Sequence, residues 1–218
     1  MLESLPPNDR ELLQSLLRRR RYRRGEVVFH QGDPGDTLHI VRRGYLKVVV
    51  PSEAGGEGVL AVVGPGALFG EITLLDGAPR SATVVALEDV ETATLGRAAF
   101  RDLLRRSPDV AESLLAAMAG TIRRLTAEVT DLMFLDLRAR LVHKLLELAE
   151  GHGVRLPDGA VEIRVQLTQE ELAGMIGATR PRVNTLLGFF EDQGVVGRSG
   201  RHLVLVKPDR LRYWAGGG

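Results

Sequence analysis

The sequence predicts an α+β protein with a β-rich first half and a helical second half. Short apolar runs separated by Gly, Pro and Asp clusters occupy the stretch from about Glu26 to Gly96, a spacing typical of a β barrel or sandwich. From about Arg97 the apolar residues recur at helical intervals instead, which indicates a helical part. With 218 residues, 44% of them hydrophobic, the chain can form one large domain or two ordinary ones.

Composition excludes several classes of protein. The chain has no cysteine, so we expect no disulfide, no Cys-ligated zinc and no iron–sulfur cluster; the scattered histidines favour no metal site either. No apolar run approaches the ~20 residues of a membrane helix, and the first residues, MLESLPPNDRELLQ, carry no secretory signal. The net charge of +1 excludes a polybasic mechanism for the whole chain. We expect a soluble cytoplasmic protein that does not contact a membrane.

Six strands are expected in the first half: Val27–Phe29, Leu38–Val41, Leu46–Val50, Val59–Val63, Ala82–Leu87 and Val90–Leu95. Glycine-rich turns separate them, for example at residues 32–36 and 52–58. The Arg-rich run at residues 18–24 is predicted to be the solvated end of a helix that leads into the first strand, where positive charge is favourable. Contact of this run with DNA or a polymerase is the alternative.

A long helix is predicted to begin at Pro108, with Ser107 as its cap. Apolar residues recur along it at alternating steps of three and four, which makes an a/d seam. The seam consists of Leu115, Met118, Ile122, Leu125, Val129 and Leu132. A narrow seam of this kind is suited to burial against a second copy of the same helix, so we expect a homodimer. The alternative is an ordinary core helix packed on the β-rich part.

Asp136 follows the seam and is predicted to cap a further helix over Leu137–Ala149, which ends at the Gly-His-Gly of residues 151–153. Beyond Asp136, basic residues outnumber acidic ones, whereas the reverse holds before it. The C-terminal part is therefore the more basic one, as a nucleic-acid module would be.

Two short helices joined by a tight turn are expected near the C-terminus. Thr168 and Glu171 have the spacing of a capping box, and Gly177 permits a left-handed turn. Thr179 is placed to cap the next helix, with Pro181 in its first turn, where a missing N–H costs little. This order of signals is that of a helix-turn-helix unit. The strands Val195–Arg198 and Leu203–Val206 then form a hairpin with a basic tip, a wing.

The second helix of such a unit enters the major groove of double-stranded DNA with its N-terminal residues toward the base edges. Arg can bond two acceptors of guanine and Asn can pair with adenine, whereas Arg on a phosphate positions the protein without specifying sequence. The candidate DNA contacts are Thr168, Thr179, Arg180, Arg182, Asn184, Thr185 and, in the wing, Arg201. For any single Arg, the alternative is a solvated surface charge.

A second candidate site lies in the β-rich half, over residues 69–83. It combines Gly70, a carboxylate at Glu71 and the pair Arg80 and Ser81. A carboxylate can accept from a sugar hydroxyl, and Arg with a neighbouring hydroxyl and exposed amides can hold a phosphate. The chemistry suggests a sugar-phosphate ligand. A plain ion pair between Glu71 and Arg80 is the alternative.

The segment 69–83 resembles the phosphate-binding cassette of cyclic-nucleotide-binding domains, and the turns at residues 30–36, 44 and 64–66 match the same domains. With the helix-turn-helix, essentially the whole chain resembles the cyclic-AMP receptor protein/FNR (CRP/FNR) family of bacterial transcription regulators. The resemblance implies three parts. These are a cyclic-nucleotide-binding-type β-roll (jelly roll) over residues 1–107, a dimerisation helix and hinge over 108–136, and a winged helix-turn-helix over 137–218.

The resemblance also implies an effector and partners. Cyclic AMP would place its ribose hydroxyl at Gly70 and Glu71 and its cyclic phosphate at Arg80, Ser81 and the Ala82 amide, while Thr126 could bond the base. The implied ligand residues are Gly70, Glu71, Ile72, Arg80, Ser81, Ala82 and Thr126. The implied partners are a second copy of the chain, a pseudo-palindromic DNA operator and RNA polymerase, for which the loop at residues 157–159 is a candidate contact.

Some positions depart from the family pattern. Leu125 stands where nucleotide-responsive members carry a polar residue against the base. The alternative function is therefore a constitutive DNA-binding regulator whose pocket is vestigial or takes another effector. Pro181 and Thr185 stand where readers of the best-known half-site carry Glu and Arg, so that half-site is not expected, although Arg180 is retained. No P-loop, nucleophile elbow or HExxH motif is present, so we do not expect an enzyme.

Overall fold

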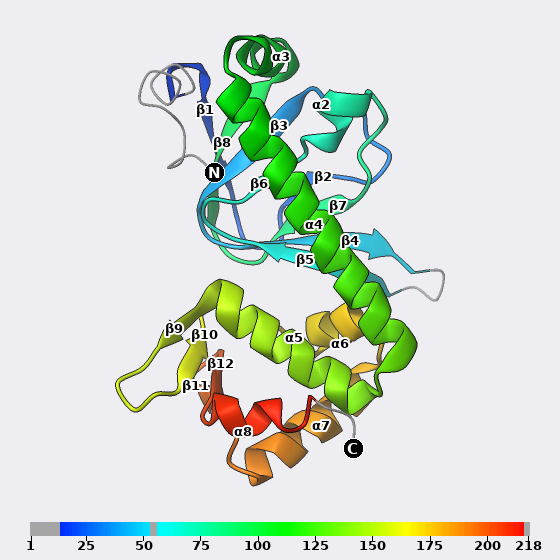
Figure 1. Cartoon of the computed structure of the whole chain (residues 1–218), viewed down its shortest axis with the longest axis vertical. Helices are drawn as coiled ribbons and strands as arrows, with labels where there is room; N and C mark the ends of the chain where they lie inside the picture. Colours follow the sequence, from blue (N-terminus) through cyan, green and yellow to red (C-terminus); the bar gives the residue numbers. More distant parts are fainter. Residues whose placement is uncertain (1–13, 53–55, 216–218) are drawn as a thin grey trace. The chain divides into compact units, whose positions relative to one another are not determined.

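The computed structural model describes residues 14–52 and 56–215 of the chain (Figure 1). The chain divides into two compact units, one of Met1–Val50 and Leu60–Leu125 and the other of Pro51–Val59 and Thr126–Gly218. Residues 1–13 and residues 53–55, the centre of the predicted turn at 52–58, lie outside the described residues. No helix in the described ranges is both long and apolar enough to cross a membrane.

Two four-stranded sheets form the β-rich part, which confirms the predicted β-roll. One sheet has the order β1-β8-β3-β6 and consists of β1 (Arg18–Tyr22), β3 (Thr37–Arg43), β6 (Leu68–Phe69) and β8 (Val90–Gly96). The other has the order β2-β7-β4-β5 and consists of β2 (Val27–Phe29), β4 (Leu46–Pro51), β5 (Glu57–Val63) and β7 (Thr83–Ala86). All six predicted strands are present. Strand β6 was not predicted, because a strand of two residues is too short to show an alternation of apolar and polar side chains.

Strand β3 is buried on both faces and separates two apolar clusters. On one face, Leu38 and Ile40 pack against Phe100 of helix α3 (Arg97–Arg106) and Val110 of helix α4 (Pro108–Phe134), both drawn beside the sheet in Figure 1. On the other face, Val41 belongs to a cluster between the sheets. That cluster consists of Val41, Leu46, Phe69, Val84, Ala86 and Val90. The double burial explains why β3 is almost continuously apolar.

The prediction for the Arg-rich run was wrong. Residues 18–22 form the edge strand β1, which pairs antiparallel with β8, Tyr22 opposite Val90. Tyr22 packs against the inter-sheet cluster, and Glu91 of β8 forms ion pairs with Arg19 and Arg21. The pairing with β8 and the packing of Tyr22 outweigh the helical preference of Arg, because propensity is weak beside tertiary contact.

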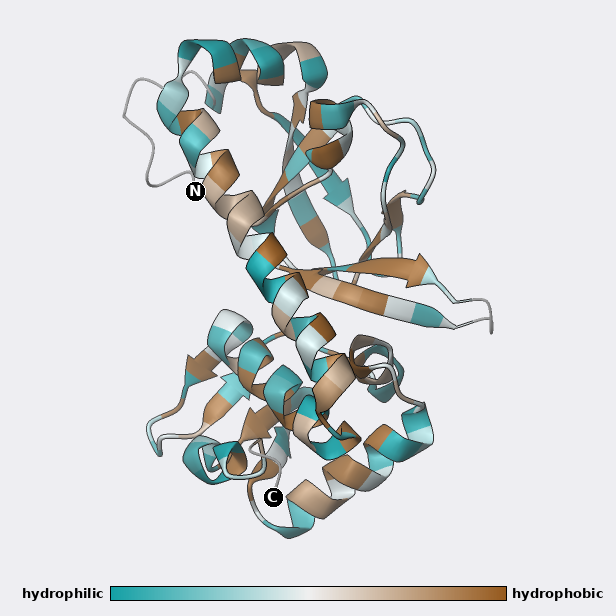
Figure 2. Ribbon diagram, turned by 45° about the vertical axis from the view of Figure 1, so that its right-hand side comes forward, coloured by the Kyte–Doolittle hydropathy of each residue, from teal (hydrophilic) through white to brown (hydrophobic). Residues whose placement is uncertain are grey.

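Helix α4 has one buried and one exposed apolar side. Val110 and Leu114 are buried, and Met118 packs partly on the same cluster. The other seam residues are between 38% and 65% exposed: Leu115, Ile122, Leu125, Val129 and Leu132. Figure 2 shows apolar and polar bands alternating along this helix. The alternative of an ordinary core helix thus holds only for its first turns, and the homodimer stays a prediction.

The second unit contains the predicted winged helix-turn-helix. Its helices are α5 (Leu137–His152), α6 (Gln169–Ile176), α7 (Arg180–Asp192) and a short α8 (Pro208–Arg212) that was not predicted. Its sheet has the order β11-β12-β10-β9 and consists of β9 (Gly153–Arg155), β10 (Val161–Ile163), β11 (Val196–Ser199) and β12 (His202–Leu205). Leu145, Leu172, Leu187 and Phe190 are among its fully buried side chains. These come from α5, α6 and α7, so the three helices share one core.

Helix α5 begins as predicted and ends later. The Asp136 carboxylate accepts a hydrogen bond from the Ala139 amide at 2.8 Å, which confirms the cap. The helix continues through Gly151 to His152 and stops at Gly153. A Cβ on Gly153 would lie 2.1 Å from the Ala149 carbonyl oxygen, whereas one on Gly151 would meet nothing within 4 Å. The glycine that the sharp exit requires is therefore Gly153.

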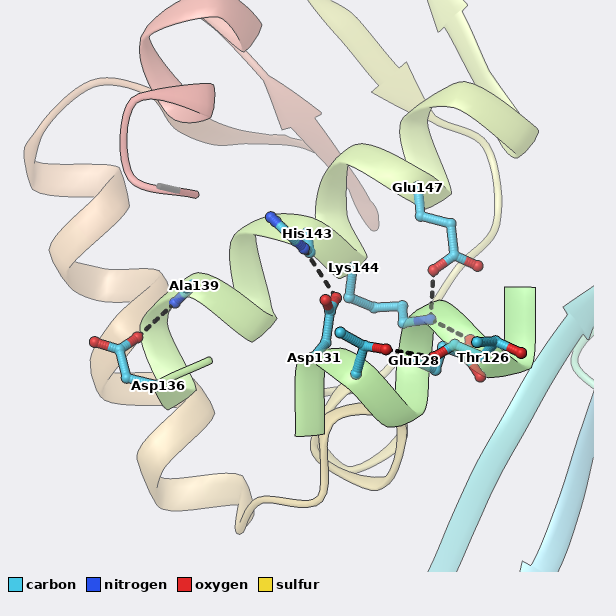
Figure 3. A network of polar contacts seen from close by, with 9 residues as sticks. Thr126, Glu128, Asp131, Asp136, Ala139, His143, Lys144 and Glu147 are labelled. Carbon is cyan, nitrogen blue, oxygen red and sulfur yellow. Dashed lines mark hydrogen bonds and ion pairs between the residues drawn. The ribbon is translucent and has the colours of Figure 1, made fainter. Parts of the chain in front are cut away.

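A polar network joins the last turns of α4 to α5 (Figure 3). Lys144 is 9% exposed, and its Nζ donates to Glu128 of α4 at 2.7 Å and to Glu147 at 2.5 Å. Asp131 of α4 lies 2.8 Å from His143 Nδ1. Glu147 lies on α5 itself, so the bond to Glu128 is the one that connects this buried ammonium to α4. These contacts therefore stabilise one angle at the α4–α5 corner.

His39 lies in the core between the sheets, as expected for a structural histidine. Its ring stacks on Phe69 with centroids 4.8 Å apart, and burial, helped by the positive charge of Arg80, lowers its pKa to about 4. Within the described part of the chain, no group of three or more His, Asp or Glu residues is placed to hold a metal ion.

We expect His39→Phe to make the protein less sensitive to acid. Below the usual histidine pKa of 6.5, the unfolded chain takes up a proton that folded His39 rejects until about pH 4. Stability is therefore full above pH 6.5 and falls by about 1.4 kcal/mol per pH unit toward pH 4. Urea unfolding at several pH values in this range gives the free energy of unfolding as a function of pH. Its slope should be shallower in the variant, by the amount that corresponds to about one proton. An unchanged slope would assign the acid sensitivity to other groups.

Candidate functional site

The predicted cassette forms one continuous turn between β6 and β7. Gly70 follows β6 with a φ of +78°, and Glu71 precedes the short helix α2 (Ile72–Asp76), its carbonyl accepting from Leu74 N at 2.9 Å. Burial raises the pKa of the Glu71 carboxyl. Both residues thus lie at the start of α2, where a carboxylate can accept from a ligand hydroxyl.

Arg80 is the buried centre of this site. Only 5% of the residue is exposed. Its Nη1 donates to the Gly70 carbonyl at 2.6 Å and its Nη2 to the Thr37 carbonyl at 2.7 Å. The guanidinium carbon lies 4.1 Å from the centroid of the Phe29 ring, a distance for cation–π attraction. The side chain therefore joins β2, β3 and the cassette turn.

Two glycines make room for this guanidinium. A Cβ on Gly35 would lie 2.5 Å from Arg80 Cζ, and one on Gly70 would lie 2.6 Å from Arg80 Nη1. Gly70 is doubly restricted, since its positive φ also disfavours any side chain. Gly70 was predicted from the sequence as a site residue, whereas Gly35, Thr37 and Phe29 were not. Of these, only Gly35 had a signal, its place in a Gly-Asp-Pro-Gly-Asp turn.

The alternative of a Glu71–Arg80 ion pair does not describe this conformation, because Arg80 donates to backbone carbonyls. Burial lowers the pKa of the guanidinium, while the charges of Asp36 and Glu71 oppose that change. Among the described residues, Arg80 Nε is buried without a hydrogen-bond partner. A buried donor without a partner is costly. An anion reaching Nε would remove that cost, so the residues present fit a phosphate group.

The other predicted ligand residues are distributed as follows. Ser81 is exposed and Ala82 is buried directly after Arg80, and Ile72 is 42% exposed on α2. Thr126 belongs to the other unit, on α4, where its carbonyl accepts from the Thr130 hydroxyl at 2.9 Å. The structure thus brings Gly70, Arg80 and their sequence neighbours together, and the role of Thr126 stays a prediction.

The helix-turn-helix has the local geometry that its sequence indicated. Glu171 N donates to Thr168 Oγ1 at 3.1 Å, and Thr168 N donates to the Glu171 carboxylate at 2.7 Å, which confirms the capping box. Gly177 ends α6 with φ +62° and ψ 45°, the left-handed conformation expected. Helices α6 and α7 are therefore connected by a turn with little freedom.

The prediction that Thr179 caps α7 was only half right. Thr179 occupies the N-cap position in an extended conformation, but its side chain makes no cap hydrogen bond. Pro181, the second helical residue, has no N–H to donate, and the amide of Arg182, the third, makes no hydrogen bond to the Thr179 side chain either. Arg180, Arg182, Asn184 and Thr185 are all exposed along the first turns of α7. The Thr185 hydroxyl donates back to the Pro181 carbonyl at 3.1 Å.

The wing lies beside these residues in the same unit. Strands β11 and β12 pair antiparallel, with Ser199 opposite His202, and Gly200 turns the tip with φ +59°. Arg201 is exposed at this tip. A hollow of about 600 Å³ is lined by residues of the starts of α6 and α7 and of the wing, among them Thr168, Gln169, Arg180 and Arg198. A concave surface that carries Arg180 and Arg198, with Glu170 as its one acidic lining residue, suits the backbone and groove of a duplex.

Gln169 belongs to this group as well, although it was not predicted from the sequence. Gln169 Nε2 donates to Asn184 Oδ1 at 2.8 Å. Its only sequence signal is its place directly after the cap residue Thr168.

Comparisons with known proteins match both parts of the chain. Residues 19–107 match the model of the cyclic nucleotide-binding domain, and residues 139–214 match that of the Crp-like helix-turn-helix domain. The chain is 34% identical to a CRP-like cAMP-activated global transcriptional regulator of Mycobacterium tuberculosis. The alignment spans 188 residues, which are 86% of this chain and 84% of that protein. The chain is 36% identical over 212 residues to the cyclic AMP receptor protein of Thermus thermophilus, covering 97% and 94%.

Solved structures agree on the fold. FixK2 from Bradyrhizobium japonicum aligns with a TM-score of 0.79 at 22% identity, over 93% of this chain and 98% of that one. At this identity the likeness concerns the fold alone.

We expect Gly35→Ala to destabilise the protein by about 1–3 kcal/mol, because the new Cβ displaces the buried Arg80 from its carbonyl partners. Gly96→Ala is the matched control, since its Cβ would meet nothing within 4 Å. Urea unfolding measures both.

The same substitution in an Arg80→Leu background identifies the cause. The cost of Gly35→Ala should then fall, because the atom that its Cβ meets is absent. An equal cost in both backgrounds would contradict the contact.

Proposed function

The chain belongs to the CRP/FNR family of bacterial transcription regulators, and on this premise we propose that it is a homodimer whose binding to a pseudo-palindromic operator is gated by cyclic AMP. It is a DNA-binding transcription regulator with a cyclic nucleotide-binding domain, not an enzyme. In this proposal residues 1–107 bind the effector, residues 108–136 dimerise and form the hinge, and residues 137–218 bind DNA.

The buried Arg80 with its unpartnered Nε carries the effector proposal. In it, Arg80 and Ser81 bind the cyclic phosphate together with the Ala82 amide. Gly70 and Glu71 bind the ribose hydroxyl, and Ile72 completes the cassette. Two relatives support cyclic AMP as the effector. The Mycobacterium tuberculosis protein is named as cAMP-activated, and the Thermus thermophilus protein is named as a cyclic AMP receptor protein.

The exposed side of α4 supports the dimer. Leu115, Ile122, Leu125, Val129 and Leu132 expose apolar surface at heptad spacing along one helix. Full burial of an exposed apolar side chain contributes about 1.5–3 kcal/mol, and each of these partly exposed residues would contribute a part of that against a second copy. Two copies of α7 would then address two half-sites about 34 Å apart.

The α4–α5 network supplies a route from effector to DNA. Thr126, the proposed base contact, lies on the same stretch of α4 as Glu128 and Asp131, which contact Lys144 and His143 of α5 (Figure 3). An effector that repositions this stretch must either carry α5 with it or break these contacts. For a shift from 1:99 to 99:1, the effector must bind the active form better by about 5.5 kcal/mol.

Leu125 supports a second candidate function. It is apolar and lies within the exposed seam, so it strengthens a helix pair without any nucleotide. In this alternative the protein binds DNA constitutively, and the Arg80 site is vestigial or takes another anionic effector.

Binding to an operator would also imply a contact with RNA polymerase and a location in the cytoplasm. A promoter-bound regulator would meet RNA polymerase, and the exposed turn between β9 and β10, with Gly159 at φ +88°, is the proposed contact. Its DNA partner would place its action in the cytoplasm.

Calorimetric titration with cyclic AMP tests the gating. We expect micromolar binding to the wild-type protein, weaker binding of cyclic GMP, and a loss of at least about 30-fold in Arg80→Leu, because a buried charge-assisted contact disappears. Binding that survives Arg80→Leu unchanged would remove the phosphate role from Arg80. No binding of either nucleotide, with operator binding intact, would establish the constitutive alternative.

Ile122→Glu tests the dimer. The substitution removes apolar surface from the seam and brings two like charges together, so the dimer dissociation constant should rise about 100-fold or more. Thr121→Glu, at the exposed neighbouring position, is the control and should leave it nearly unchanged. Sedimentation velocity over a concentration series gives both values. A monomeric wild-type protein, or equal effects of the two variants, would contradict a seam dimer.

A further inference from the structure

Gln169 and Asn184 are joined across the helix-turn-helix by one side-chain hydrogen bond. Gln169 is the first residue of α6, and its Nε2 donates to Oδ1 of Asn184 on α7 at 2.8 Å. Asn184 is exposed and Gln169 is half-buried. Arg180, the proposed guanine contact, lies one helical turn before Asn184 and so on the same side of α7. The amide pair is therefore part of the surface that faces the bases in the proposed function.

The local backbone holds both amides in place. The Thr168–Glu171 capping box defines the first turn of α6, directly where Gln169 projects. The left-handed Gly177 sets the turn into α7. Both amides therefore project from helices and not from loops. A specific contact requires side chains that are held by such elements.

The hydrogen bond selects which polar groups remain for a partner. Asn184 Oδ1 accepts from Gln169, so the Asn184 amide cannot turn its nitrogen toward Gln169 without losing that bond. Besides the second N–H of Gln169 Nε2, the pair retains a donor at Asn184 Nδ2 and an acceptor at Gln169 Oε1. In the major groove adenine presents the N7 acceptor beside the N6 donor, whereas guanine presents two acceptors. A donor beside an acceptor complements adenine and mismatches guanine.

We propose that Gln169 and Asn184 act as one reading unit for an adenine in the operator half-site, next to the guanine read by Arg180. The inference rests on the proposed DNA-binding function and adds Gln169 to the residues that determine sequence preference. Gln169 contributes twice: it fixes the Asn184 amide and presents its own acceptor.

A purely structural role makes a different prediction. If the bond only connects α6 to α7, its loss lowers affinity evenly for all sequences and changes no base preference. A reading unit instead loses discrimination at one position. Base preference is therefore the measurement that separates the two roles.

The experiment is in-vitro selection of half-sites from a randomised duplex library, using the full-length protein with and without cyclic AMP. Binding constants for each base at the selected positions follow. The wild-type protein should prefer adenine over guanine at one position by about 10-fold or more. Gln169→Ala and Asn184→Ala should each remove this preference at that same position, and the double variant should lose little more.

Gln169→Glu provides an isosteric variant. The carboxylate keeps the shape but cannot donate to Asn184 Oδ1, so the adenine preference should again be lost. Two controls separate this from general weakening. Glu170→Gln, at the exposed next residue, should change affinity evenly across sequences, and Arg180→Ala should relax a guanine at a different position. Thermal unfolding shows whether each variant is folded.

Three outcomes would contradict the proposal or the function on which it rests. If Gln169→Glu and Gln169→Ala keep the adenine preference, Asn184 reads alone or not at all, and the proposal is overturned. The same holds if the pair variants lower affinity evenly for every sequence. If the wild-type protein selects no sequence under either condition, the proposed function itself fails, which is distinct from a wild-type protein that selects a site without this adenine.

Discussion

The buried guanidinium of Arg80 is the constraint on which the ligand turn depends. A charge taken out of water needs partners, and here they are the carbonyls of Gly70 and Thr37 and the face of Phe29. These partners are dipoles and a ring rather than a counter-charge, and Nε has no partner among the described residues. In the proposed function, an anion would improve the electrostatics of this site, whose protein groups are already in contact. The same contact that holds the cassette on β3 would then also orient Arg80 for a phosphate.

The long helix α4 carries apolar residues on two different sides, one buried in the core of the first unit and one exposed. Val110 and Leu114 bury one side on the first unit's core, while residues such as Ile122 expose apolar surface at heptad spacing. Its last turns carry Glu128, which is bonded to the buried Lys144 of α5. Apolar seam and polar corner thus follow one another along one continuous helix. In the proposed regulator, this continuity is what couples association to the orientation of α5.

The recognition unit separates backbone placement from chemical reading. A capping box and the left-handed Gly177 define where α6 and α7 begin, whereas the exposed side chains of α7 select a partner. Pro181 belongs to the first group, since it offers no side-chain donor or acceptor and has no backbone N–H. In the proposed function, base reading therefore rests on the residues around Pro181, among them Arg180 and the Gln169–Asn184 pair.

The sequence by itself determined the features that arise within a few residues. Six strands, the helix starts and the turn at Gly177 follow from periodicity and cap chemistry, which act locally. Only the tertiary structure decided the contacts between distant segments. Residues 18–22 became a strand because β8 lies beside them, Arg80 reaches the Thr37 carbonyl of another strand, and Gln169 meets Asn184 of the next helix. No local pattern encodes such pairs, because their energy depends on which segments folding brings together.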